Sequence, residues 1–230
     1  MKRFWKEVSV EPEAGCWTIK LDGRPIKTPA RAALEVPMEA LAQAIAEEWR
    51  AVGETIDPRA MLLTGLANAA IDRVAPATQA FADKLANYAE ADLACYRADG
   101  PSQLADRQAE HWNRLLGWAR RRFDLDFVTT SGLMHVAQPM ATVDRLSHEV
   151  AALEAFRLAG LSPLVTIGGS LVAALAVLEK AMTPEDAWDA VSIDDRWQIE
   201  QWGADAEAEA ALENRRRDFL GAARFLNLLS

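Results

Sequence analysis

The order of apolar and polar residues changes character after about the first 36 residues of the chain. Residues 4–10 and 16–21 place β-branched and aromatic side chains at roughly alternate positions, which predicts two short strands. Asp22-Gly23 follows directly and is typical of a tight turn, because glycine adopts positive φ angles at little cost. Residues 33–36 indicate one more strand, so the chain is expected to open with a small β-rich region.

From Pro37 onward, apolar residues recur at helical spacing almost to the end of the chain. The helices that this period predicts cover residues 37–52, 61–74, 78–97, 102–123, 143–160, 162–178 and 184–202, with a last helix around 212–226. Ser162-Pro163 and Thr183-Pro184 are each typical of an N-cap followed by proline at the first helical position. We therefore expect an α+β fold, in which a small β-rich N-terminal domain with its first helix (residues 1–55) precedes a mainly α-helical, bundle-like domain (residues 56–230).

One apolar stretch raises the question of a membrane. Residues 161–178 carry no charge, but a bilayer span needs about 20 apolar residues. The stretch also contains Ser162, Thr166 and Gly168-Gly169. We expect a helix that is buried on all sides in a folded core, and no membrane insertion.

Net charge and cysteine content narrow the classes of partner and compartment. The 230 residues carry 34 acidic and 25 basic side chains, a formal net charge of -9. This charge offers no general attraction to nucleic acid or anionic lipid and favours a basic protein surface as partner. Cys16 and Cys95 form no CxxC pair, which suits two buried thiols in a reducing compartment. With no recognisable signal peptide, the expected location is the bacterial cytoplasm.

Motifs of catalysis are absent from the sequence. It contains no GxxxxGK[ST], GxGxxG, GxSxG or HExxH motif. Its three histidines, His111, His135 and His148, are not at metal-ligand spacing. Asp194 and Asp195 are adjacent on a predicted helix, where neighbouring residues do not face each other. We therefore expect no catalytic residue, no metal site and no cofactor.

The most unusual feature is an acidic segment near the C-terminus. Nine Asp and Glu residues lie from Glu185 to Glu209, and Arg196 is the only basic residue among them, which leaves a charge of -8 in 25 residues. The segment contains Trp197 and Trp202, and Trp202 stands at a predicted helix end where its ring would be half exposed. A charge run is usually a solvated helix face, whereas acid combined with exposed aromatic rings suits a protein-binding surface. Both interpretations stay open on these residues alone.

Six segments spread over nearly the whole chain carry motifs that belong together. They are residues 3–8, 21–29, 41–49, 57–72, 92–118 and 198–203. The most recognisable is Leu21-Asp22-Gly23-Arg24-Pro25-Ile26-Lys27-Thr28-Pro29. In this collinear order the segments resemble one family, the assembly chaperones that handle the alpha subunit of the catalytic sector of F-type ATP synthase.

The resemblance implies a holding chaperone, not an enzyme, that works as a monomer without nucleotide. It would bind the unassembled alpha subunit until the catalytic hexamer forms. An unassembled ring subunit exposes an apolar interface that is prone to aggregate, and a protein that covers this interface keeps the subunit soluble. The related eukaryotic proteins would work in the mitochondrial matrix.

The residues expected to contact the partner lie mainly in the acidic segment. They are Trp197, Gln198, Glu200, Trp202, Gly203, Asp205 and Glu207, together with Arg24 and Lys27 of the N-terminal motif. A carboxylate such as Glu200 near a helix C-terminus is unfavourably placed for the helix dipole, and a basic side chain of the partner would compensate it. The competing interpretation is that Glu200 caps or solvates the helix.

Two other functions remain compatible with the residues. An enzyme would combine a carboxylate with His111 or His135, since catalytic sites form from residues far apart in sequence. A scaffold would bind some other protein through its acidic segment. A deep pocket with convergent polar groups favours the enzyme, whereas a broad acidic and aromatic surface favours a binding protein.

Overall fold

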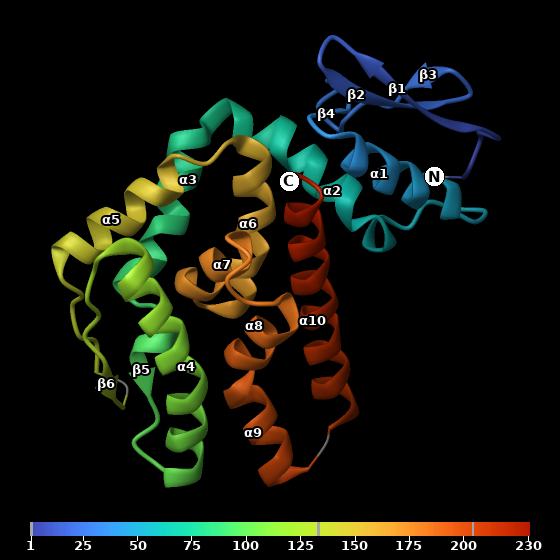
Figure 1. Ribbon diagram of the computed structural model, residues 1–230. Helices are drawn as coiled ribbons and strands as arrows, with labels where there is room; N and C mark the ends of the chain where they lie inside the picture. The colour runs from blue at the N-terminus through green and yellow to red at the C-terminus, as the bar shows by residue number, and fades with distance from the viewer. Residues whose placement is uncertain (1, 133, 204) are drawn as a thin grey trace. The chain divides into compact units, whose positions relative to one another are not determined.

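The computed structural model describes residues 2–132, 134–203 and 205–230, which fold into two compact units. The first unit comprises Met1–Thr78, Glu154–Gly160 and Arg224–Ser230, and the second comprises Gln79–Leu153 and Leu161–Ala223. A small sheet near the N-terminus is followed by a chain that is mostly helical, so the predicted α+β fold class is confirmed (Figure 1). The domain boundary predicted after residue 55 stays a prediction.

The sheet of the first unit is antiparallel and is built around its second strand. Its members are β1 (Val8–Glu13), β2 (Cys16–Leu21), β3 (Arg24–Pro25) and β4 (Glu35–Val36), and β2 pairs with each of the other three. Helix α1 (Glu39–Ala51) packs against β1 and β2 and buries Leu41 and Ile45 completely. The first strand begins only at Val8, later than the sequence predicts, because the preceding backbone bonds to a side chain instead of to a neighbouring strand.

That side chain is Asp22, in the turn between β2 and β3. Asp22 and Gly23 have φ angles of 47° and 77°, which is the backbone of a type I′ turn and confirms the predicted tight turn. The Asp22 carboxylate accepts hydrogen bonds from the N–H groups of Glu7 at 2.8 Å and Lys6 at 3.0 Å. These two donors lower the pKa of Asp22, so the turn also anchors the start of the chain.

Other carboxylates tie the helices of the first unit to its loops. Helix α2 (Leu62–Ala69) starts beside Glu48 of α1, whose carboxylate accepts from the backbone N–H and the hydroxyl of Thr64 at 2.8 and 2.7 Å. Asp72, in the π-helical turn after α2, accepts from the hydroxyl of Thr28 at 2.6 Å. Each contact satisfies a polar group at a helix end or in a loop that has no partner within its own element.

The remaining elements run from α3 to α10. They are α3 (Thr78–Ala86), β5 (Tyr96–Arg97), α4 (Ser102–Phe123), β6 (Thr130–Ser131), α5 (Met140–Ala151), α6 (Ala155–Gly168), α7 (Leu171–Leu178), α8 (Pro184–Val191), α9 (Ile193–Trp202) and α10 (Ala206–Asn227), and β5 and β6 pair in parallel. Helix α4 spans the residues that the apolar period predicts. It buries Trp112, Leu115, Ala119 and Phe123, which the same period placed on its inner face.

The predicted start of an apolar helix at Pro163 is wrong. Pro163 lies inside α6, and the break comes at Gly169, whose φ is 67°, before Ser170 caps α7 through its hydroxyl. Leu161 and Leu164 beside the proline are completely buried, so apolar packing outweighs the backbone hydrogen bond that proline removes. Within the described ranges, no helix combines the length and the hydropathy that a bilayer span requires.

The helix predicted over residues 184–202 is two helices, α8 and α9. Thr183 caps α8 as expected, because its hydroxyl accepts from the N–H of Asp186 at 3.1 Å. Ser192 ends α8, and its buried hydroxyl donates to the carbonyl of Trp188 at 2.7 Å. A serine that bonds back to the preceding turn competes with helical hydrogen bonding, and the helix divides there.

Asp92 is a fully buried carboxylate in a segment that the sequence predicts to be helical as far as residue 97. One of its oxygens accepts from the N–H of Ala94 at 3.0 Å and the hydroxyl of Ser170 at 2.8 Å, and the other accepts from the N–H of Val172 at 3.0 Å. Burial raises the pKa of Asp92, although each of these hydrogen bonds acts in the opposite direction. Asp92 thus connects the turn after α3 to the start of α7.

Gly23→Val should lower the free energy of unfolding by on the order of 1–2 kcal/mol, because a β-branched residue is strained at positive φ. A Cβ atom at Gly23 meets nothing within 4 Å, so crowding does not contribute. Gly53→Val is the matched control, since a Cβ there also meets nothing within 4 Å and Gly53 is not among the glycines with positive φ. Equal urea midpoints for the two variants would show that the turn is not strained by a side chain.

Asp92→Asn should lower the free energy of unfolding by about 1–3 kcal/mol, because an amide NH₂ would then face buried donors that need an acceptor. Asp57→Asn is the control: Asp57 is exposed and accepts in the same way from the N–H of Arg59 at 3.0 Å. Asparagine serves about as well as aspartate at such a cap. Urea unfolding compares the two, and equal losses would contradict the role assigned to Asp92.

Candidate protein-binding site

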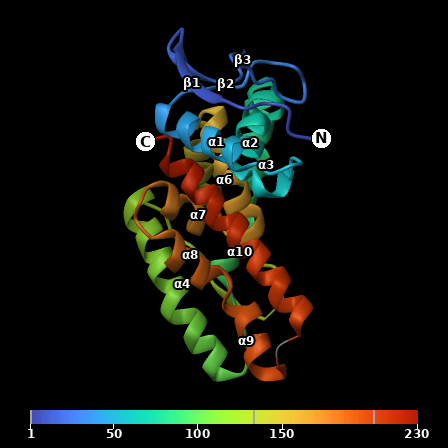
Figure 2. The same ribbon diagram turned by 90° about the vertical axis from the view of Figure 1, so that its right-hand side faces the viewer.

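Helices α9 and α10 form a hairpin that carries most of the predicted contact residues, and Figures 1 and 2 show the two helices side by side. Gly203, with a φ of 84°, ends α9, and its N–H donates to the carbonyl of Ile199 at 3.0 Å. Asp205 precedes α10 and accepts from the N–H of Glu207 at 3.1 Å. Glu207 and Glu209 stand in the first turn of α10, where the helix dipole favours acid.

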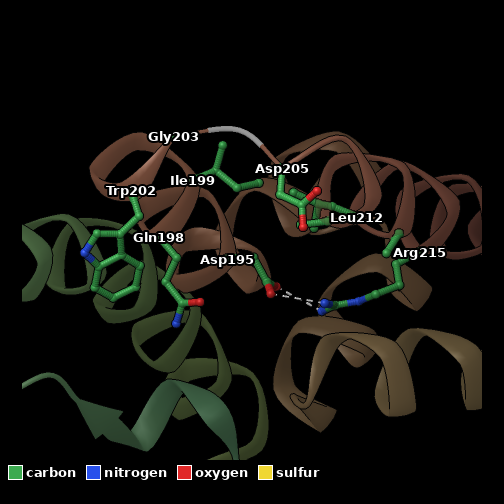
Figure 3. Close-up of a pocket in the computed structure, with 10 residues that line it drawn as sticks. Asp195, Gln198, Ile199, Trp202, Gly203, Asp205, Leu212 and Arg215 are labelled. Carbon is green, nitrogen blue, oxygen red and sulfur yellow. Dashed lines mark hydrogen bonds and ion pairs between the residues drawn. The ribbon is translucent and has the colours of Figure 1, made fainter.

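An open groove of about 340 Å³ lies between the two helices (Figure 3). Its lining residues are Asp195, Gln198, Ile199, Trp202, Gly203, Asp205, Ala208, Ala211, Leu212 and Arg215. The structure thus brings together four of the predicted contact residues: Gln198, Trp202, Gly203 and Asp205. Trp202 is 80% exposed, so its ring is more accessible than the half exposure that the sequence predicts.

Two other predicted contact residues, Trp197 and Glu200, interact with α4. The two oxygens of Glu200 accept from Nη1 of Arg107 at 2.9 and 3.0 Å, and the guanidinium of Arg107 lies 5.1 Å from the centre of the Trp197 ring. The hydrogen bond from Arg107 lowers the pKa of Glu200. A cation of this chain therefore already compensates Glu200, and a contact between Glu200 and a partner stays a prediction.

Two more carboxylates of the acidic segment form ion pairs with arginines. Asp195 forms two hydrogen bonds with Arg215 at 3.0 and 3.1 Å, and Asp189 lies 3.0 Å from Arg196. Among the described residues, no ion pair involves Glu185, Asp186, Asp194, Asp205, Glu207 or Glu209. Three of these six carboxylates lie at the start of α10, next in sequence to Trp202. The start of α10 therefore carries acidic side chains that form no ion pair among the described residues, and they follow the exposed Trp202 closely in sequence.

The two units differ in net charge, and the excess of acidic residues lies in the second unit. The first unit contains twelve basic and twelve acidic residues, whereas the second contains thirteen basic and twenty-two acidic residues. The second unit thus carries the whole net charge of -9.

Arg24 and Lys27, on β3 and just after it, belong to the neutral first unit and are exposed. Their contact with a partner stays a prediction.

The titratable groups elsewhere make local contacts. The described residues contain no group of three or more His, Cys, Asp or Glu placed to hold a metal ion. Nδ1 of His135 lies 3.0 Å from the hydroxyl of Tyr96, and Nδ1 of His148 lies 2.8 Å from the carbonyl of Asp144. Burial raises the pKa of the Cys95 thiol to about 12. The groove between α9 and α10 offers a polypeptide aromatic, aliphatic and charged contacts.

Several residues of the site were not predicted from the sequence. They are Asp195, Ile199, Ala208, Ala211, Leu212 and Arg215 in the groove, and Arg107 on α4. The spacing of Ala208, Ala211 and Leu212 places them on one helix face, so this stripe was recognisable. Nothing in the sequence pairs Arg107 with Glu200, which lies 93 residues further along the chain.

Comparison with known proteins now identifies the family. A family model described as ATP12 chaperone protein matches residues 2–120. The crystal structure of Atp12 from Paracoccus denitrificans is 43% identical with a TM-score of 0.94, and the match covers 100% of this chain and 98% of that chain. The chain belongs to the ATP12 chaperone family.

Two further relatives agree with this assignment. The crystal structure of the Atu1473 protein from Agrobacterium tumefaciens is 36% identical with a TM-score of 0.94, covering 100% of this chain and 86% of that chain. The mitochondrial protein atp12 of Schizosaccharomyces pombe is 25% identical over an aligned stretch of 219 residues, and the match covers 88% of this chain and 74% of that protein. The family resemblance inferred from the motifs is thus confirmed.

Glu200→Gln should make the protein less stable than the wild type at pH 7, and the difference should vanish in acid. The pKa of Glu200 is lowered from its ordinary 4.5 by Arg107. The contribution of the pair is therefore present above pH 4.5 and is lost as the pH falls through the lowered pKa. Urea unfolding from pH 7 to pH 3 measures this change. The control is Glu110→Gln, because Glu110 is an exposed residue of α4 without an ion pair among the described residues. Its stability difference from the wild type should not vanish in acid. If both variants respond to pH in the same way, the Arg107–Glu200 pair is not the cause.

Proposed function

We propose that this protein is an assembly chaperone of F-type ATP synthase that binds the unassembled alpha subunit. It covers the apolar interface of that subunit until the catalytic hexamer forms, and it acts as a monomer, without nucleotide, in the bacterial cytoplasm. Membership of the ATP12 chaperone family is the observation that carries this proposal. Membership of a chaperone family also favours binding over the enzyme that the sequence alone leaves open.

The physical task of such a protein is to lower the concentration of free, aggregation-prone subunit. A free interface subunit exposes apolar surface that drives aggregation. A binder whose free concentration is 100 times its Kd stabilises the folded state of its client by about 2.7 kcal/mol. The binder must later yield to the neighbouring subunit of the ring, so a surface of moderate affinity suits the task better than a deep, enclosed site.

The hairpin of α9 and α10 has the features of such a surface. Trp202 is 80% exposed, and the groove beside it is open and partly aliphatic. Exposed tryptophans are enriched among the residues that contribute most to protein interfaces. The carboxylates at the start of α10, which form no ion pair among the described residues, would attract and orient a basic partner surface. We therefore assign alpha-subunit binding to this hairpin.

Co-expression tests the function and the surface together. The alpha subunit should remain soluble with the wild-type chaperone, and Trp202→Ala should weaken the complex by about 2 kcal/mol without changing the melting temperature. Phe4→Ala is the matched control, because Phe4 is also a large exposed aromatic residue, 68% accessible, in the first unit. An alpha subunit that aggregates with the wild type would refute the function, and equal losses for the two variants would refute the surface. Capture of a different protein in place of the alpha subunit would favour a scaffold.

A further inference from the structure

The loop that joins β3 to β4 contains a residue that its backbone conformation does not favour. The N–H of Thr28 donates to the carbonyl of Ala32 at 2.9 Å, and the N–H of Arg31 donates to the carbonyl of Thr28 at 2.8 Å. These bonds close a three-residue hairpin loop, whose last position adopts positive φ and is usually glycine. Arg31 occupies this position with a φ of 70°. A long cationic side chain thus stands where glycine is the favoured residue.

Arg31 differs from other residues with positive φ in having no charged partner within the chain. Asp22 binds the start of the chain through its carboxylate, and Lys180 follows the end of α7, where the helix dipole favours a cation. The side chain of Arg31 is exposed and forms no ion pair with a described residue. Residues held in an unfavourable backbone conformation occur preferentially at functional sites.

A carboxylate from a later element holds this loop in place. Asp72 accepts from the hydroxyl of Thr28 at 2.6 Å and from the N–H of Ala30 at 2.9 Å, and the Thr28 hydroxyl accepts from the N–H of Ala32 at 3.1 Å. Thr28 is buried, and Asp72 lies in the same unit, in the π-helical turn after α2. Single π-helical turns are frequent at functional sites. The backbone around Arg31 is therefore fixed in advance, which lowers the entropy cost of binding.

Lys27 adds a second cation beside the loop. It pairs with Ala33 just outside the loop, its side chain is exposed, and it too forms no ion pair with a described residue. An ammonium and a guanidinium without resident acids recognise carboxylates and phosphates. Nucleic acids and anionic membranes carry many charges and are repelled by the net charge of -9 on the chain. A short acidic segment of a protein carries far fewer charges and is the favoured ligand.

We infer that the loop of residues 27–33 is a second client-binding surface, on which Lys27 and Arg31 bind carboxylates of an acidic segment of the client. Arg31 is the contact residue, and Asp72 is a positioning residue that acts through the loop backbone. This inference rests on the proposed function only in naming the alpha subunit as the client. It also gives a role to the end of the N-terminal motif, residues 21–29, which the surface on α9 and α10 does not involve.

The test uses the full chain and two kinds of probe. The first is a short synthetic peptide with Glu at alternate positions, compared with a peptide that has Gln in place of each Glu. The second is the purified alpha subunit. Each is titrated against the wild type, Arg31→Gly and Lys180→Gly. Lys180→Gly is the matched control, because it also replaces an exposed cation at positive φ, here 59°, by glycine, but in the second unit.

Arg31→Gly should bind the Glu peptide and the alpha subunit about threefold more weakly, the size expected for one exposed ion pair. Its melting temperature should be no lower than that of the wild type, because glycine relieves the strain of positive φ. Arg31→Asn, which also tolerates positive φ and lacks the chain entropy of glycine, should behave in the same way. A purely structural role of Arg31 does not combine weaker binding with undiminished stability.

Salt and position provide two further readouts. Adding Lys27→Gln to Arg31→Gly should weaken binding of the Glu peptide about tenfold in total. Higher ionic strength should weaken binding to the wild type more than to this double variant, since salt screens exposed charge pairs. In isotope-labelled protein, the amide signals of residues 27–33 should shift with the Glu peptide and not with the Gln peptide. Lys180→Gly should bind both probes as the wild type does.

The outcomes separate the inference from the function. The inference is overturned by lower melting temperatures for both Arg31→Gly and Arg31→Asn, by equal binding of the two peptides, or by equal affinity of the alpha subunit for Arg31→Gly and Lys180→Gly. Tighter binding of single-stranded DNA or of phosphatidylglycerol vesicles than of the Glu peptide also overturns it. In each case, an alpha subunit that binds the wild type leaves the proposed function standing. Conversely, the expected peptide results with no binding of the alpha subunit support the loop and its specificity but refute the proposed function.

Discussion

The candidate site depends on how helix α4 holds α8 and α9 in place. Trp112 donates through its indole N–H to the carbonyl of Ala190 at 2.7 Å, and the Nε2 of Gln108 donates to Asp194 at 2.7 Å. Gln108 is buried, and its oxygen in turn accepts from the N–H of Ala98 at 2.7 Å, so both ends of its amide are satisfied. One residue before Gln108, Arg107 bonds to Glu200. Buried polar groups are costly when unpaired, and this requirement fixes the position of α9 and with it one wall of the groove.

The carboxylates of the acidic segment differ in whether they have a partner within this chain. Within the acidic segment, three carboxylates pair with arginines of the second unit and a fourth accepts from Gln108. These contacts serve the packing of helices, and exposed pairs of this kind contribute little stability each. The carboxylates without an ion pair among the described residues include those at the start of α10, which follow Trp202 in sequence. The paired part of the segment thus holds helices together, and a binding surface stays a prediction for the part without ion pairs.

An open groove with charged lining residues suits the release of a client that the proposed function requires. An enclosed apolar pocket would bury more surface and bind more tightly, which would slow handover to the next subunit. Electrostatic complementarity contributes more to orientation and association rate than to affinity. Under the proposed function, the exposed aromatic ring and the charged lining of the groove can therefore select and orient a segment of the client without trapping it.

Local patterns in the sequence were enough to predict the β-rich start, the Asp22-Gly23 turn, the whole of α4 and, through collinear motifs, the family. These features follow from neighbouring residues, because hydrophobic period, turn chemistry and capping act over a few positions. The sequence also located Trp202, Gly203 and Asp205 as parts of one surface, since they lie within four residues of one another. Tertiary structure decided the helix boundaries, with a break at Gly169 in place of Pro163 and a division at Ser192. It also decided the pairing of Glu200 with Arg107 and completed the groove with Ala208, Ala211 and Arg215. Each depends on which side chains meet across helices, and that is set by the packing of the whole unit, not by spacing along the chain.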